Sequence, residues 1–181
     1  MLTQITNLLL QVFVSIVAGA CLVRCYLQWL AFNLGSGPSR SIGAYILPLT
    51  NWIVLPLRKV IPSVGRFDVA SCLAAFLVIL AKSFVLAFLL GDTLALLPHV
   101  LFALFDLLDL AISGLIGLVF ASVILSWISQ GSQIQYLVAL LIEPLLNPIR
   151  RVMPNMGALD LSPLALLLGL QVLQIVINHL R

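Results

Sequence analysis

Four long apolar stretches constrain the fold of this chain more than any other feature of its sequence. They cover about residues 5–32, 69–90, 111–128 and 161–177. Crossing the hydrocarbon core of a bilayer takes about 20 helical residues, and only helices and closed barrels satisfy every backbone polar group in lipid. The alternating pattern of barrel strands is absent, and only 8% of the residues are charged. The sequence therefore predicts an all-α membrane protein with four transmembrane helices.

A sixteen-residue string occurs twice, once in each half of the chain. Residues 56–71 read PLRKVIPSVGRFDVAS, and residues 148–163 read PIRRVMPNMGALDLSP. At an offset of 92, six positions are identical: Pro56/Pro148, Arg58/Arg150, Val60/Val152, Pro62/Pro154, Gly65/Gly157 and Asp68/Asp160. We therefore predict two tandem repeats, residues 1–92 and 93–181, with two transmembrane helices each. An even number of spans per repeat makes the two repeats parallel rather than inverted.

Among the connections between the apolar stretches, lysine and arginine occur only in the two loops that contain the repeated string. Loop 33–68 carries four of them and loop 129–160 carries two, whereas the connection 91–110 has none and has three aspartates instead. Positively charged loops stay on the cytoplasmic side of a membrane. The sequence thus predicts that both basic loops are cytoplasmic and that both termini lie on the opposite side.

A shorter, partly apolar segment precedes each string. These segments read SIGAYILPLTNWIVL and IQYLVALLIEPLLN, and prolines (Pro48 and Pro144) interrupt them. Stretches of this length are more typical of interfacial or re-entrant segments than of spans. We expect them to lie along the inner leaflet, with Tyr45, Trp52 and Tyr136 at headgroup depth.

Each string places two adjacent cations between prolines. The cations are Arg58 with Lys59 and Arg150 with Arg151, and the prolines are Pro56, Pro62, Pro148 and Pro154. Proline removes a backbone donor and fixes φ, so we expect a rigid turn of helix at most. Such a turn can serve topology alone, or it can bind anionic lipid headgroups or a partner protein.

A glycine and an aspartate complete each string. Gly65 and Gly157 suit a sharp turn of the chain. Asp68 and Asp160 directly precede an apolar stretch, where each can cap the next helix and pair with a nearby arginine. In the second copy Ser162, followed by Pro163, is an equally good cap.

Few polar side chains lie within the apolar stretches. Arg24 is followed one turn later by Gln28, and near the interface it can snorkel. Lys82 lies deeper, where it can pair with an aspartate, snorkel or serve transport. Gln171 and Gln174 belong to one polar stripe, which more often joins helices than lines a pore.

No pattern of catalytic, cofactor-binding or metal-ligating residues is present. His99 and His179 have no partner at ligand spacing, and Cys21, Cys25 and Cys72 lack a redox or metal spacing. The sequence predicts a protein that is not an enzyme, with no cofactor and no nucleic-acid partner.

The chain resembles one known protein family in three features. These are the repeated strings at 56–62 and 148–154, the Gly-x-x-Asp-x-Ser-Pro at 157–163, and the tryptophans Trp29 and Trp127 late in two apolar stretches. That family is the YggT family. The first copy departs from this pattern with Ala70-Ser71 in place of Ser-Pro. The resemblance implies a small integral protein of a bacterial inner membrane or a plastid. It further implies links to osmotic-stress tolerance, potassium handling, cell division or cytochrome assembly, and it supplies no catalytic residues.

Two functional hypotheses follow. The first is a non-catalytic scaffold or assembly factor that contacts anionic lipid or a membrane or cytoplasmic partner through both basic loops. The alternative is a small transporter or channel component for potassium or osmolytes, in which Arg24, Lys82, Gln171 and Gln174 face a pathway. Self-association is possible under both, and residues 94–110 either extend the third helix or lie at the outer interface.

Overall fold

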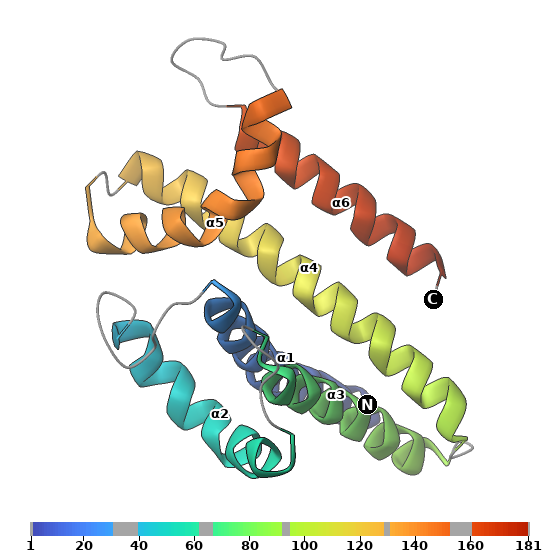
Figure 1. Ribbon diagram of the computed structural model, residues 1–181. Coiled ribbons are helices and arrows are strands. Elements are labelled where there is room, and N and C mark those ends of the chain that lie inside the picture. Colours follow the sequence, from blue (N-terminus) through green and yellow to red (C-terminus); the bar gives the residue numbers. More distant parts are fainter. Residues whose placement is uncertain are drawn as a thin grey trace. The chain divides into compact units, whose positions relative to one another are not determined.

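The computed structural model describes residues 2–30, 40–61, 67–91, 95–128, 131–152 and 161–180. Within these ranges the chain forms six α-helices and no sheet (Figure 1). The helices are α1 (Leu2–Trp29), α2 (Arg40–Val60), α3 (Val69–Leu90), α4 (Leu96–Ile128), α5 (Gln133–Val152) and α6 (Ser162–Leu180). The order of a long apolar helix, a shorter helix with a basic end and another apolar helix occurs twice.

Four helices are long and apolar enough to cross a membrane: α1, α3, α4 and α6. This confirms, for the residues that the structure describes, the predicted all-α class and four helices able to span a membrane. The second predicted span coincides with α3, whereas α4 begins fifteen residues before the predicted third span. Residues 96–110 therefore extend that helix, and its 33 residues give a length of about 50 Å. That the two halves are parallel repeats stays a prediction.

Helices α2 and α5 occupy the segments that precede and include the basic pairs. Pro48 and Pro56 lie inside α2, and Pro144 and Pro148 lie inside α5. From the sequence we expect Pro56 with Pro62, and Pro148 with Pro154, to limit the repeated string to a turn of helix at most. This is wrong for Pro56 and Pro148, because each lies within a helix of 20 or more residues, whereas Pro62 and Pro154 lie outside the described residues. In α2 both prolines and the residues four positions earlier, Ala44 and Trp52, are exposed. The carbonyls that lose a helical donor therefore lie on the outer face, where other groups can solvate them.

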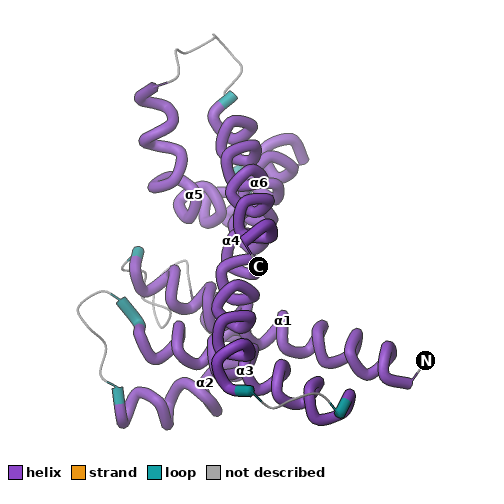
Figure 2. The backbone as a smooth tube through the Cα atoms, turned by 90° about the vertical axis from the view of Figure 1, so that its right-hand side faces the viewer, coloured by secondary structure: helices purple, strands orange, loops and turns teal. Residues whose placement is uncertain are grey.

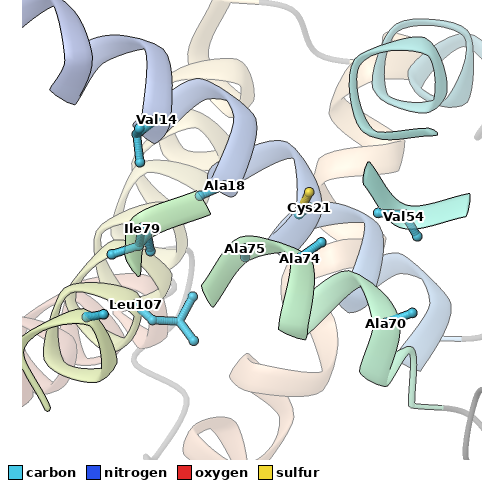
Figure 3. Packing of buried hydrophobic residues seen from close by; sticks show 10 residues of the cluster. Val14, Ala18, Cys21, Val54, Ala70, Ala74, Ala75, Ile79 and Leu107 are labelled. Atoms are coloured by element: carbon cyan, nitrogen blue, oxygen red, sulfur yellow. The ribbon is translucent and has the colours of Figure 1, made fainter. Parts of the chain in front are cut away.

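The chain divides into two compact units, residues 1–110 and 111–181. In the first unit α1 runs antiparallel to α3, and α2 packs against both (Figure 1, Figure 2). Small side chains fill the contact, among them Ala18 and Cys21 of α1 and Ala70, Ala74 and Ala75 of α3 (Figure 3). Small residues allow helix backbones to approach closely in lipid.

The second unit contains the carboxyl-terminal part of α4 together with α5 and α6. Ile112 and Val119 of α4 form a buried cluster with Ile142 and Leu146 of α5 and Leu170 of α6. Helix α6 is otherwise largely exposed.

Candidate functional site

Asp68 caps the amino terminus of α3. Its carboxylate accepts hydrogen bonds from the backbone N–H of Ser71 at 3.3 Å and from the Ser71 hydroxyl at 2.6 Å. The side chain is fully buried. These bonds satisfy one of the amino-terminal N–H groups that a helix leaves unpaired. The cap prediction is confirmed for Asp68.

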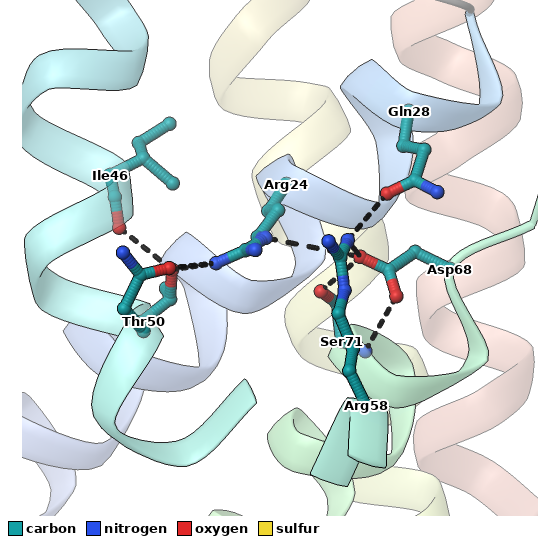
Figure 4. Close-up of polar contacts among 8 residues, drawn as sticks. Arg24, Gln28, Ile46, Thr50, Arg58, Asp68 and Ser71 are labelled. Carbon is teal, nitrogen blue, oxygen red and sulfur yellow. Dashed lines mark hydrogen bonds and ion pairs between the residues drawn. The ribbon is translucent and has the colours of Figure 1, made fainter. Parts of the chain in front are cut away.

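Arg58 joins the end of α2 to both neighbouring helices. One terminal guanidinium nitrogen, Nη2, donates to Asp68 Oδ2 at 2.5 Å and to Gln28 Oε1 of α1 at 2.7 Å (Figure 4). The adjacent Lys59 is exposed. The two adjacent cations therefore have different surroundings: Arg58 is half-buried against α1 and α3, and Lys59 lies at the surface.

Arg24 of α1 points into the protein and is only 3% exposed. Its Nη1 donates to Thr50 Oγ1 at 2.9 Å and to Asn51 Oδ1 at 2.8 Å, both on α2. Its Nε lies 3.9 Å from Asp68 Oδ2. The expectation that Arg24 snorkels to the interface is wrong, because α2 and α3 supply polar partners beside it.

Arg24, Arg58 and Asp68 form a three-charge cluster with a net charge of +1. Burial alone would raise the pKa of Asp68, but hydrogen bonds from Arg58 and Ser71 outweigh it and hold the pKa below the ordinary value. The carboxylate is thus ionised at neutral pH. The Nε atoms of both arginines are buried and have no hydrogen-bond partner among the described residues.

This cluster is built for attachment rather than for proton transfer. Asp68 already accepts bonds from two side chains and one backbone group, which favours its charged form. Through it, α2 is fixed by ion pairs and hydrogen bonds to α1 and α3. The arrangement holds Lys59 at a defined place on the surface of the first unit.

The exposed side chains of α2 and α5 combine aromatic and apolar groups with cations. On α2 they include Tyr45 (82%), Trp52 (61%), Leu55 and Lys59. On α5 they include Ile134 (64%), Tyr136 (61%), Glu143, Arg150 and Arg151. Aromatic side chains beside cations suit the headgroup boundary of a bilayer.

Lys82 and Asp106 form an ion pair within the first unit. Lys82 Nζ of α3 lies 3.3 Å from Asp106 Oδ2 of α4, and each side chain is less than one-fifth exposed. Of the alternatives for Lys82, the structure realises pairing with an aspartate. The neutralised pair joins α3 to α4 and offers no free charge.

The two glutamines of α6 also differ. Gln174 Nε2 donates to Ser113 Oγ of α4 at 2.9 Å, which joins two helices of the second unit. Gln171, by contrast, is exposed.

The remaining motif residues are only partly described. Pro62, Gly65, Pro154, Gly157 and Asp160 lie outside the described residues. Helix α6 begins at Ser162, which is buried, with Pro163 next in its first turn, where proline is tolerated. Among the described residues, no group of three or more His, Cys, Asp or Glu side chains is placed to hold a metal ion.

Sequence reasoning missed Ser71, Thr50 and Asn51. Ser71 had a signal, since it lies three residues after a capping aspartate and its N–H is the usual target of such a cap. Thr50 and Asn51 had none, because nothing in the sequence shows which face of α2 meets Arg24.

The fold and this site together define a multi-pass membrane protein whose polar groups join helices at the ends of its spans. The chain belongs to the CCB3/YggT family, which matches residues 3–89 and 101–180. It is 35% identical over 167 residues to the uncharacterized protein YggT of Escherichia coli K12, covering 91% of this chain and 85% of that protein. It is 39% identical over 130 residues to an uncharacterized protein of Vibrio alginolyticus, covering 70% of each chain. No solved structure matches the chain.

Proposed function

We propose that this chain is a non-catalytic scaffold or assembly factor of a bacterial inner membrane. It contacts anionic headgroups, or a partner that carries similar charges, through the basic ends of α2 and α5. One observation supports this proposal above the others: the three-charge cluster fixes α2, while Lys59 at its end stays exposed. Arg150 and Arg151 are exposed at the end of α5 in the same way.

The proposed orientation of the chain in the membrane follows from the distribution of charge. Six Lys and Arg residues lie in the two basic loops and none lies in the connection 91–110. Both helix ends then lie at the cytoplasmic surface and both termini are periplasmic. Anionic lipids of that leaflet attract each surface cation by about 1 kcal/mol.

The alternative, transport of potassium or osmolytes, depends most on Lys82. Since Lys82 is paired with Asp106, it has no free charge to offer a pathway. We therefore favour the scaffold.

The test uses purified protein in vesicles of phosphatidylcholine with spin-labelled phosphatidylglycerol, whose association with the protein is measured by electron paramagnetic resonance. The variant Lys59→Gln/Arg151→Gln removes one exposed cation from each helix end and leaves the three-charge cluster intact. At about 1 kcal/mol per cation, selectivity for the anionic lipid should fall roughly five-fold at each site. The matched control, Lys59→Arg/Arg151→Lys, keeps both charges and should keep the selectivity.

Unchanged selectivity in the neutral variant would contradict lipid binding by these helix ends. A second measurement checks sidedness: Lys59→Cys should resist a membrane-impermeant maleimide added to intact cells. Labelling from outside would show that this end of α2 faces the periplasm, which would contradict the proposed orientation.

A further inference from the structure

One face of α6 carries a regular set of exposed side chains. Spacings of 4, 3, 4 and 3 residues place them on a single stripe along the helix. This stripe, the α6 seam, consists of Leu164, Leu168, Gln171, Ile175 and Asn178. The leucines and the isoleucine are each more than half exposed. The spacing is that of the contact positions in a pair of supercoiled helices.

Gln171 indicates what kind of partner covers the α6 seam. It is the tenth of nineteen residues in α6, so it lies about 14 Å along the axis from either end of the helix. A glutamine side chain is too short to reach the headgroups from there. Its amide makes no hydrogen bond to any residue that the structure describes, although Gln174, one turn on, reaches Ser113. Lipid tails offer no partner, so a polar group at this depth needs another helix.

The occupant follows from the chemistry of the amide. A primary amide carries both a donor and an acceptor, so it is complementary to itself. In a twofold dimer each residue at the centre of the interface meets its own copy, so one glutamine satisfies the other. A polar residue within a heptad seam also fixes the register of the two helices. We propose that the α6 seam pairs with the α6 seam of a second copy of this chain, with the two Gln171 amides hydrogen-bonded across the interface.

This inference goes beyond the scaffold function and does not depend on it. The test measures energy transfer between donor- and acceptor-labelled full-length chains in vesicles, over a series of protein-to-lipid ratios. Gln171→Leu should weaken self-association roughly 3- to 30-fold, the range expected for interhelical hydrogen bonds in membranes. Gln171→Asn, which keeps an amide, should retain more of the association than Gln171→Leu. Equal transfer in wild type and Gln171→Leu, or no transfer at any ratio, would overturn the proposal.

Cysteine cross-linking locates the interface independently of stability. Gln171→Cys and Leu168→Cys should form disulfide-linked dimers on oxidation. The matched control is Leu173→Cys, which is also exposed but lies on the opposite side of α6. The native cysteines provide the blank, since the wild-type chain carries Cys21, Cys25 and Cys72 in the first unit. A dimer band of equal strength from Leu173→Cys would show that the α6 seam does not define the contact. A link within one chain would show that another part of the same chain covers it.

Discussion

Replacing Asp68 by asparagine tests the three-charge cluster directly. Asparagine is nearly isosteric and can still accept a hydrogen bond from the Ser71 N–H, so the cap of α3 is kept. The change removes the only carboxylate within reach of Arg24 and Arg58 among the described residues, and the charge of the cluster rises from +1 to +2. Removing one partner of a buried ion pair costs about 3–5 kcal/mol. Because the Arg58 side chain is 35% exposed and so partly screened, we expect about 3 kcal/mol.

The assay is unfolding in mixed micelles with rising SDS content, followed by far-ultraviolet circular dichroism. The control is the double variant Asp68→Asn/Arg58→Met, which returns the cluster to a charge of +1. It should recover more than half of the free energy of unfolding lost in Asp68→Asn. A loss of only about 1 kcal/mol in Asp68→Asn would mean that its role is that of a cap alone. Additive losses in the double variant would refute the electrostatic coupling.

Three further outcomes are expected in the same unfolding assay. Folding lowers the pKa of Asp68 below 3.8, so its contribution to the free energy of unfolding should be fully present above that pH and should be lost as the pH falls through the pKa of the folded state. If the free energy of unfolding of wild type exceeded that of Asp68→Asn by the same amount at pH 2 as at neutral pH, this reasoning would be contradicted. Lys82→Met should cost about 3 kcal/mol because it removes the cation that neutralises the Asp106 carboxylate, and Lys82→Met/Asp106→Leu should cost less; an equal cost would argue against the ion pair. Ala74→Leu should destabilise the first unit by about 1–3 kcal/mol because Ala74 is fully buried between α1 and α3, whereas Leu77→Ala on an exposed face should have little effect.

The spans were predictable because lipid leaves the backbone few options. An apolar stretch of about 20 residues has to be helical wherever it crosses, whatever its neighbours are. The bounds of α3 could be read directly, since Asp68 marks its start and Gly91 marks its end. Gly91 has a φ of 67°, a left-handed conformation that ends helices and that glycine adopts without strain.

Which cation of the basic pair contacts Asp68 and which one is exposed could not be predicted. Arg58 and Lys59 are neighbours of like charge, and only the rotation of α2 about its axis decides which one meets Asp68. That rotation is set by tertiary contacts such as those of Thr50 and Val54, which a single sequence does not reveal. The persistence of α2 through Pro48 and Pro56 was missed for a related reason. The cost of a lost helical bond depends on where the freed carbonyl points.

The separation of the cluster along the chain has a consequence for biogenesis. Arg24 emerges from the ribosome 44 residues before Asp68, so the first apolar helix enters the membrane with a cation that nothing yet neutralises. A charge within a span disfavours its independent insertion. We therefore expect stable integration of α1 to be completed only when α3 arrives with the Asp68 carboxylate. Synthesis halted before residue 68 should leave a segment that is held less firmly in the bilayer than its apolar length alone suggests.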